Sequence, residues 1–395
     1  MSYFKADALR SWQSQALNAW HGVGERGIVE VVTGAGKTRL ALAAAREWMA
    51  KHPSGKLIVI VPTSALQDQW ILALAGDVGV SIDNIGTWPG NNDRSATIHV
   101  LIVNTARRIA NNLAGDKPVF LIADECHRYA TPQNVRAVDV DAVAALGLTA
   151  TAERQYDDGL FDVLVPAIGP LFFKYDLVAA RRDGVVTPFD LVNVEISLLP
   201  DEADAYHAAT KQLTWAMAAE DRDAIKRISL RRASVVKSAR LRIPASVALL
   251  DRLRSARTLI FHEEILSAEI IARLLVERGH SVGTYHSHLG ASIRRDNLRN
   301  FREGLLDVLV ACRALDEGVD VPDAQCAVIA SASASRRQRI QRLGRVLRTS
   351  RDKQLATVYT IYATDLEKQR LTEEQRHLSD VADVRWMKVN VRAHG

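Results

Sequence analysis

The chain has 395 residues, of which 48% are hydrophobic and 25% are charged, so it has enough apolar material for two hydrophobic cores and cannot be wholly disordered. No apolar run approaches the ~18–20 residues needed to cross a bilayer. The three cysteines, Cys126, Cys312 and Cys326, are too widely spaced for a zinc cluster or a disulfide framework. We therefore expect a cytoplasmic protein that does not contact membranes.

The positive charge is concentrated in one segment. The formal net charge is +5, yet residues 226–257 contain ten lysines and arginines, among them Arg231 and Arg232, against a single acid, Asp251. The rest of the chain is therefore slightly acidic. A basic block of this kind is typical of proteins that bind a polyphosphate partner such as nucleic acid. A solvated helix face gives the same composition, and the charge pattern leaves both interpretations open.

The first part of the chain alternates short β-branched runs with helical segments such as 37–50 and 64–74. Buried strands are predicted at 28–32, 57–61, 98–103, 119–123 and 145–149. Continuous apolar strands separated by helices indicate a parallel sheet covered on both faces. We expect this first domain at 1–175.

The alternation stops after the first domain and then resumes. We expect a linker at 176–200, with an apolar run at 191–196, and then a helical insertion at 201–255 that contains the basic segment. Strands of a second domain are predicted at 258–261, 281–285, 308–311, 327–330 and 357–361. We place this domain at 256–365 and a helical tail at 366–395. The predicted fold class is α/β, with two tandem domains.

A glycine-rich segment follows the first predicted strand and opens a helix. Residues 31–38 read Val-Val-Thr-Gly-Ala-Gly-Lys-Thr, and such a loop can turn its backbone N–H groups toward the phosphates of ATP. Lys37 would pair with the phosphates, and Thr38 would bind Mg²⁺. Val31 stands where the strict consensus has glycine, and a chance glycine turn is the alternative. The predicted nucleotide-binding residues are Gly34, Ala35, Gly36, Lys37 and Thr38.

Two carboxylates, Asp124 and Glu125, end the strand predicted at 119–123. Asp124 can bind Mg²⁺, and Glu125 can orient or deprotonate the water that attacks the γ-phosphate. Acids at a strand end also cap helices, although the upstream loop favours the catalytic role. Cys126 and His127 lack a third metal ligand nearby, and we expect His127 to link hydrolysis to the neighbouring domain.

Residues 124–127, Asp-Glu-Cys-His, resemble the DExH box of superfamily 2 helicases, and the resemblance covers most of the chain. It implies two RecA-like domains that hydrolyse ATP with Mg²⁺. Residues 9–13, Leu-Arg-Ser-Trp-Gln, resemble the adenine-reading motif of that family, which implies that Arg10 and Gln13 contact the base. The start of an amphipathic helix is the alternative.

Further motifs of the same family are expected to touch nucleic acid or to couple it to ATP. Residues 61–64 and the pair Asn104 and Thr105 resemble motifs that contact the nucleic-acid backbone, although polar groups at strand ends are also ordinary helix caps. Residues 147–151 resemble the motif that couples the two sites. The residues implied are Pro62, Thr63, Asn104 and Thr105 for nucleic acid, and Thr149 and Thr151 for coupling.

The second predicted domain carries two more such motifs. Residues 311–322 resemble the family's motif V, which implies that Gly318 and Asp320 face the nucleotide. Cys312 stands where the family usually has threonine, at a position that contacts the nucleic-acid backbone. Residues 341–348 resemble motif VI, which implies a coupling role for Gln341. Arg345 and Arg348 would then be the arginine fingers.

Residues 9–13, 62–70 and 316–322 resemble the XPB-like and RadD-like DNA helicases and the motor subunits of restriction enzymes more than the DEAD-box RNA helicases. The short Arg-Glu-Asp element of the XPB-like group is here 154–157, Arg-Gln-Tyr-Asp, which departs from it. The basic segment, with Arg231 and Arg232, occupies the place of inserted helices that grip nucleic acid in that group.

The resemblance implies an ATP-dependent DNA helicase or translocase that acts in DNA repair or processing. DNA is favoured over RNA as the partner, and a nuclease is a candidate accessory protein. The alternatives are an RNA helicase, a duplex DNA translocase that separates no strands, and a nucleic-acid-binding scaffold that does not hydrolyse ATP.

Overall fold

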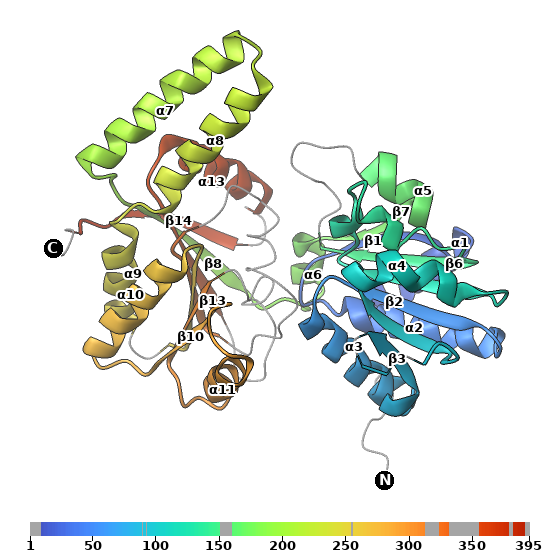
Figure 1. Cartoon of the computed structure of the whole chain (residues 1–395). Coiled ribbons are helices and arrows are strands. Elements are labelled where there is room, and N and C mark those ends of the chain that lie inside the picture. The colour runs from blue at the N-terminus through green and yellow to red at the C-terminus, as the bar shows by residue number, and fades with distance from the viewer. Residues whose placement is uncertain are drawn as a thin grey trace. The chain divides into compact units, whose positions relative to one another are not determined.

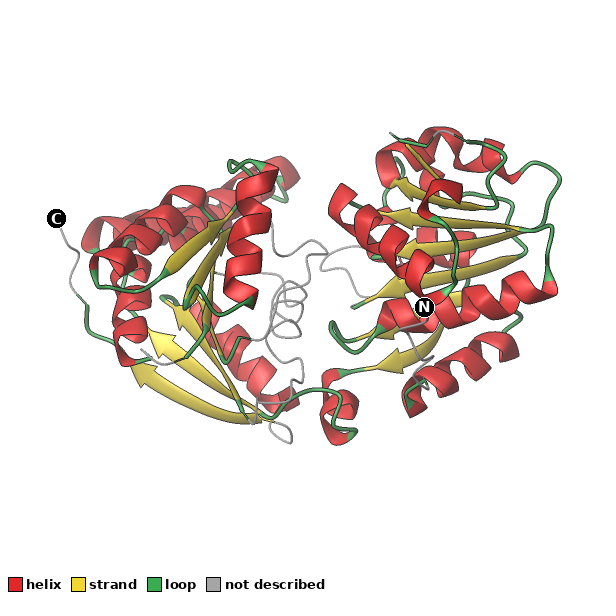
Figure 2. Cartoon of the chain, turned by 90° about the horizontal axis from the view of Figure 1, so that it is seen from below, coloured by secondary structure: helices red, strands yellow, loops and turns green. Residues whose placement is uncertain are grey.

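The computed structural model describes residues 9–88, 90–91, 93–150, 160–253, 256–312, 324–331, 355–378 and 382–391. The chain divides into two compact units, with the boundary between Ala180 and Arg181 (Figure 1). Each unit contains a seven-stranded sheet, and helices cover both faces of each sheet (Figure 2). Among the described helices, none is both long enough and apolar enough to cross a membrane.

The sheet of the first unit is parallel throughout, with the strand order β3-β4-β2-β5-β6-β1-β7. Its strands are β1 (Arg26–Val31), β2 (Lys56–Val61), β3 (Ile85–Trp88), β4 (Ile98–Ile102), β5 (Val119–Asp124), β6 (Ala144–Thr149) and β7 (Leu171–Tyr175). Its helices are α1 (Ser11–Gly22), α2 (Lys37–Lys51), α3 (Ser64–Asp77), α4 (Val103–Ala114), α5 (Val165–Ile168) and α6 (Leu177–Arg182). The short helical turns are η1 (Ile82–Asn84), η2 (Cys126–Tyr129), η3 (Val135–Ala137) and η4 (Leu160–Leu164).

The central strands of this unit were predictable because their environment is apolar on both faces. Every residue of β2, β5 and β6 is buried, which requires the continuous apolar runs seen in the sequence. The edge strands β3 and β7 were not predicted, because each is partly exposed and lacks such a run.

The second unit has a parallel sheet with the order β10-β11-β9-β12-β13-β8-β14. Its strands are β8 (Phe189–Glu195), β9 (Thr258–His262), β10 (Val282–Tyr285), β11 (Val308–Cys312), β12 (Cys326–Ile329), β13 (Ala356–Tyr362) and β14 (Ala382–Lys388). Its helices are α7 (Pro200–Ala218), α8 (Arg222–Lys237), α9 (Arg242–Arg252), α10 (Ile265–Glu277), α11 (Ala291–Arg302) and α13 (Asp365–Leu378).

The structure corrects the domain boundaries predicted for the second half. The segment 176–200, predicted as a linker, contains β8, which pairs along its whole length with β13 and with β14. The tail at 366–395, predicted as helical, contains the strand β14 after α13. A parallel sheet joins strands that are distant in sequence, so the run at 191–196 could be recognised as apolar but not assigned to a sheet whose next strands lie far along the chain.

The helical insertion predicted at 201–255 comprises two different parts. Helices α7 and α8 form a hairpin that projects from the second unit (Figure 1). Helix α9 instead belongs to the core of the unit, where Ala245, Val247 and Leu250 pack with strand residues such as Ile260. We call α7 and α8 the helical hairpin.

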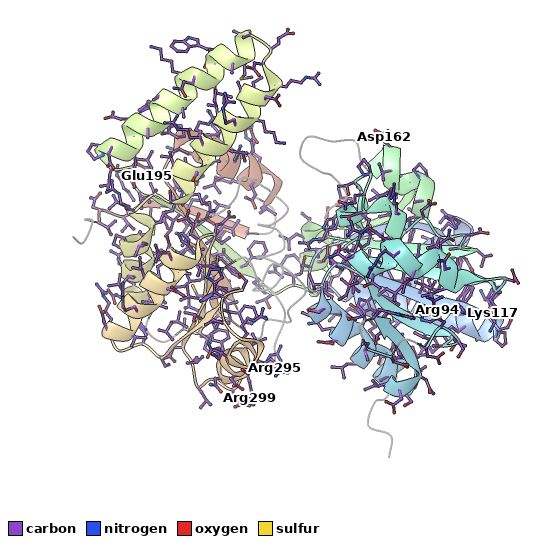
Figure 3. All side chains as sticks on the ribbon, viewed as in Figure 1. Arg94, Lys117, Asp162, Glu195, Arg295 and Arg299 are labelled. Carbon is purple, nitrogen blue, oxygen red and sulfur yellow. The ribbon has the colours of Figure 1, made fainter. Side chains whose placement is uncertain are left out.

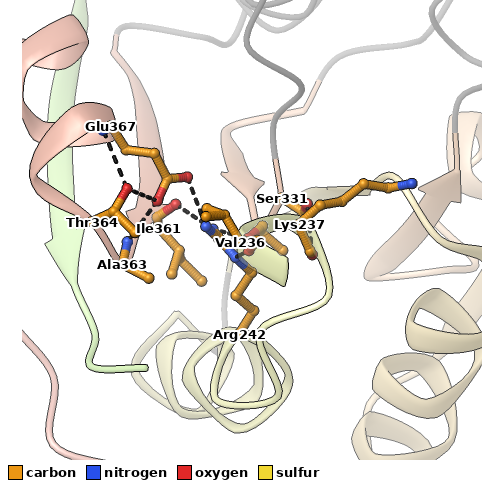
Figure 4. A network of polar contacts seen from close by, with 9 residues as sticks. Val236, Lys237, Arg242, Ser331, Ile361, Ala363, Thr364 and Glu367 are labelled. Carbon is orange, nitrogen blue, oxygen red and sulfur yellow. Dashed lines mark hydrogen bonds and ion pairs between the residues drawn. The ribbon is translucent and has the colours of Figure 1, made fainter. Parts of the chain in front are cut away.

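Arg242, one of the ten cations of the basic segment, is buried in a polar network at the base of the helical hairpin (Figure 4). Its Nε donates to the carbonyl of Val236 at 2.8 Å. One terminal nitrogen donates to the carbonyls of Ala330 at 2.9 Å and Ile361 at 2.7 Å, and the other to Glu367 at 2.7 Å. Arg242 therefore joins α8, β13, α13 and the residue that follows β12, and it does not contribute surface charge.

Candidate active site

The candidate site lies at the carboxyl edge of the first unit's sheet, where ligands bind in open α/β sheets. Strands β5, β6 and β1 are neighbours there, and Asp124 is in register with Leu148. Asp124 and Thr149 end their strands at this edge, and the loop after β1 leads into α2. Arg94 and Lys117, labelled in Figure 3, precede β4 and β5 and therefore belong to the opposite edge.

The glycine-rich loop between β1 and α2 adopts the conformation that its glycines permit. Gly34 has φ +88° and Gly36 has φ +104°, in the region that side chains disfavour. A Cβ at Gly36 would lie 2.8 Å from the side-chain nitrogen of Gln13. Lys37 begins α2, and its Nζ donates to the carbonyl of Val31 at 3.1 Å. The loop thus places an ammonium group and a helix N-terminus together, which is an anion-binding arrangement.

The two residues predicted to read adenine hold this loop from the start of α1. Arg10 donates from a guanidinium nitrogen to the carbonyl of Ala35 at 3.0 Å, and Gln13 donates to the carbonyl of Gly36 at 3.0 Å. The amide oxygen of Gln13 accepts from the backbone N–H of Arg10 at 2.8 Å, which also caps the helix. The helix-start interpretation therefore holds, and the same residues additionally contact the glycine-rich loop.

Asp124 is a buried carboxylate with two hydrogen-bond donors. Its Oδ1 accepts from the backbone N–H of Glu125 at 2.9 Å, and its Oδ2 accepts from the indole Nε1 of Trp70 at 2.9 Å. Burial and the neighbouring charge of Glu125 raise the pKa of Asp124 to about 6. A bound cation would offset both effects, so the chemistry of this side chain fits Mg²⁺.

Glu125 adopts a left-handed backbone conformation, with φ 49° and ψ 46°. For a residue other than glycine this costs roughly 1–3 kcal/mol, and such strain clusters at functional sites. Its side-chain Oε2 is buried without a hydrogen-bond partner among the described residues. It lies 3.5 Å from Nδ1 of His127.

The structure brings together two residues predicted to couple hydrolysis to the rest of the protein. Nδ1 of His127 lies 2.9 Å from the hydroxyl oxygen of Thr149, and both side chains are buried. Nε2 of His127 has no hydrogen-bond partner within the part of the chain that the structure describes. Among the described residues, no group of three or more histidine, cysteine, aspartate or glutamate side chains could hold a metal ion.

Sequence reasoning missed two aromatic residues that support the acid pair. The hydroxyl of Tyr129 donates to the backbone carbonyls of Asp124 at 2.7 Å and Ile60 at 3.0 Å, which fixes the end of β5 against β2. Trp70 donates to the carboxylate of Asp124 itself. Trp70 ends the pattern noted at 62–70, so the signal was present, but nothing in the pattern indicated its partner.

Two family models match the sequence. Residues 7–154 match the family described as type III restriction enzyme, res subunit, and residues 242–350 match the helicase conserved C-terminal domain. Together these two matches cover most of the chain. The chain is similar in sequence to helicases over most of its length.

The chain is 28% identical over 392 residues to the DNA 3′-5′ translocase XPB2 of Sulfurisphaera tokodaii, an alignment that covers 93% of this chain and 84% of that protein. It is 29% identical over 393 residues to the DNA 3′-5′ helicase XPB of Kineococcus radiotolerans, covering 95% of this chain. The chain spans 65% of that second relative, just under two thirds of its length.

Among solved structures, the helicase domain of Pyrococcus furiosus Hef has a TM-score of 0.57 at 17% identity, with 93% of this chain and 98% of that chain covered. A likeness at this identity concerns the fold. It confirms the predicted fold class, because the two parallel sheets correspond to two RecA-like domains.

The residues that this chain is predicted to use for nucleic acid lie near strand ends. Thr63 caps α3, its hydroxyl oxygen accepting from the backbone N–H of Leu66 at 3.4 Å, so the capping alternative holds for Thr63. Asn104 and Thr105 lie in the first turn of α4. Cys312 ends β11 and is 4% exposed. Contacts of these residues, and of the half-buried Pro62, with nucleic acid stay predictions.

Several predicted site residues of this chain fall outside the described residues. They are Thr151 and the 154–157 element that follows it, Gly318 and Asp320 of motif V, and Gln341, Arg345 and Arg348 of motif VI.

The basic segment is less exposed than its sequence indicates. Arg242 is buried, and Arg240 forms ion pairs with Asp201 and Glu202 of α7. On α8, Arg231 is exposed, and Arg232 is half-buried with its guanidinium 5.9 Å from the ring centre of Tyr206. Surface charge is therefore carried by part of the segment only.

Proposed function

We propose that this chain is an ATP-driven DNA helicase or translocase that moves in the 3′-to-5′ direction, in the cytoplasm, during DNA repair or processing. The observation that carries the proposal is the assembly, at one sheet edge, of the glycine-rich loop, the acid pair of Asp124 and Glu125, and the His127–Thr149 contact. The names of the two relatives, a DNA 3′-5′ translocase and a DNA 3′-5′ helicase, support the substrate and the direction.

ATP would be held by groups already positioned around the loop. The backbone of Gly34, Ala35 and Gly36, the ammonium of Lys37 and the start of α2 would bind the phosphates, while Arg10 and Gln13 would contact adenine. Thr38 and Asp124 would hold Mg²⁺. When bound, Mg²⁺ neutralises the charge that develops on the phosphate oxygens during transfer.

Hydrolysis would depend on Glu125. Its buried Oε2 has no hydrogen-bond partner among the described residues and can accept a hydrogen bond or a proton from the attacking water. His127 lies beside Glu125 and contacts Thr149 at the end of β6. A movement of the Glu125 side chain during hydrolysis would therefore be passed through His127 to Thr149. Gly318 and Asp320 would face the nucleotide, and Gln341 and Thr151 would take part in coupling. Arg345 and Arg348 would act as arginine fingers, which typically raise the rate of hydrolysis by about 10³–10⁵-fold.

Nucleic acid would be held mainly through its phosphates. The proposed contacts are Pro62, Thr63, Asn104, Thr105 and Cys312, together with Arg231 and Arg232 of the helical hairpin. The hairpin projects from its unit and carries further exposed cations on α8, such as Lys226 and Arg227. Phosphate contacts make binding largely independent of sequence and steeply sensitive to salt. The match to a restriction-enzyme subunit supports a nuclease as an accessory partner.

Release of a block from one end of DNA tests the function and its direction together. Single-stranded DNA carries streptavidin on biotin at either its 5′ or its 3′ end, and a third-strand displacement assay on duplex DNA runs beside it. If the chain moves along single-stranded DNA, we expect ATP-dependent release of streptavidin to be faster from the 5′ end than from the 3′ end. If it is a duplex translocase, we expect ATP-dependent displacement of the third strand.

Other outcomes select the alternatives. Release from the 3′ end alone reverses the proposed direction. Activity on RNA alone identifies an RNA helicase, and binding without ATP-dependent release on any polymer identifies a scaffold.

A further inference from the structure

The indole of Trp70 holds one oxygen of the Asp124 carboxylate. Trp70 lies on α3 and is 1% exposed, and its Nε1 donates to Oδ2 at 2.9 Å. The other oxygen, Oδ1, accepts from the backbone N–H of Glu125 at 2.9 Å. The carboxylate thus has one donor from its own loop and one from a helix on a different part of the chain.

These two donors fix the orientation of the Asp124 carboxylate, whose negative charge is costly to bury away from water. A buried carboxylate must be paired or hydrogen-bonded to stay charged, and a hydrogen bond to an ionised acceptor is about twice as strong as a neutral one. Tyr129 does not share this task, because its hydroxyl binds the backbone carbonyl of Asp124 rather than the carboxylate. Among the described residues, the side-chain hydrogen bond to this carboxylate comes from Trp70.

The other buried tryptophans of the first unit show that this contact is not a general consequence of burying an indole. Trp12 and Trp48 have no hydrogen-bond partner for Nε1 within the described part of the chain. Trp20 donates to the backbone carbonyl of Ala145 at 3.1 Å. Trp70 therefore packs as the others do and in addition reaches the acid pair.

We propose that Trp70 is a positioning residue for the metal: its indole N–H fixes the Asp124 carboxylate in the orientation that holds Mg²⁺. The inference rests on the proposed role of Asp124 as a Mg²⁺ ligand. Hydrogen bonds to ligating carboxylates hold them in place, and losing such a partner typically costs about 10–100-fold in metal affinity. Loss of the indole N–H therefore raises the Mg²⁺ requirement more than it lowers turnover at saturating Mg²⁺.

The test uses the full chain and MgCl₂ titrations with two readouts: binding of N-methylanthraniloyl-ADP by fluorescence, and DNA-stimulated ATP hydrolysis. The variants are Trp70→Phe, which removes the donor, and Trp70→His, whose imidazole Nε2 occupies the ring position of the indole Nε1. Trp48→Phe is the matched control, since it makes the same truncation at a buried indole without a partner. A thermal melt checks that each variant is folded.

We expect Trp70→Phe to raise the half-saturating Mg²⁺ concentration by about tenfold or more in both readouts, with a smaller change in kcat at saturating Mg²⁺. Trp70→His has a smaller side chain but keeps the donor, so we expect its half-saturating Mg²⁺ concentration to lie nearer that of the wild type. Trp48→Phe leaves the half-saturating Mg²⁺ concentration unchanged. The proposal is overturned if Trp70→Phe behaves as Trp48→Phe does, or if Trp70→His needs more Mg²⁺ than Trp70→Phe. Nucleotide binding by the wild type that does not depend on Mg²⁺ would instead overturn the metal role of Asp124 itself.

Discussion

Replacing Glu125 with glutamine is expected to lower DNA-stimulated ATP turnover by about 10²–10⁴-fold, the usual contribution of a general acid or base. The change is nearly isosteric, so the backbone of η2 and the contact between His127 and Thr149 should persist. Nucleotide binding should persist as well. The charge of Glu125 is one cause of the raised pKa of Asp124, so its removal lowers that pKa and keeps Asp124 ionised at neutral pH.

The measurement combines steady-state ATP hydrolysis with a binding titration of a fluorescent ADP analogue. The chain offers a matched control in Glu220, another glutamate with positive φ, at 53°, in the turn of the helical hairpin. Glu220→Gln should leave turnover near that of the wild type. A Glu125→Gln variant that keeps more than a small fraction of wild-type turnover would contradict the assignment of Glu125 as the group that activates water.

Replacing Arg242 with alanine is expected to destabilise the second unit by about 3–5 kcal/mol, the cost of removing one partner from a buried ion pair. The change removes one hydrogen-bond donor from Oε1 of Glu367 and one from each of three backbone carbonyls. These groups lie on α8, β13 and α13 and just after β12, so the loss affects the base of the helical hairpin and the sheet together.

Urea unfolding of the full chain measures this loss, and hydrogen exchange in peptides from β13 and α13 assigns it to the second unit. Arg240→Ala is the control, because Arg240 lies two residues away but is 55% exposed in its ion pairs, and such surface pairs contribute little. We expect its loss of stability to be a small fraction of that of Arg242→Ala. Equal losses of stability in the two variants would contradict the structural role.

Arg242 also shows where sequence reasoning reached its limit in this chain. In the sequence it is one of ten cations in a basic segment, and no local pattern separates it from Arg231 or Arg232. Its partners, Ala330, Ile361 and Glu367, lie about ninety or more positions further along the chain. Burial of a charged side chain depends on such distant contacts, which a pattern of neighbours does not contain.

The same distinction applies to the fold and the candidate site. Strands buried on both faces, such as β2, β5 and β9, leave continuous apolar runs and were predicted, whereas the edge strands β3, β7 and β14 leave mixed ones. The glycine-rich loop and the acid pair depend on local spacing and could be located. The hydrogen bond from Trp70 to Asp124 joins residues 54 positions apart, so the two residues were visible separately and their contact was not.

The central claim is that this chain hydrolyses ATP in response to nucleic acid. The most direct test is the rate of ATP hydrolysis at low salt, without polymer and with single-stranded DNA, duplex DNA or RNA, with Lys37→Ala as the blank. We predict strong stimulation by DNA that raised salt weakens and that Lys37→Ala abolishes. An ATPase rate that no polymer changes, in a folded chain that still binds DNA, would contradict the claim.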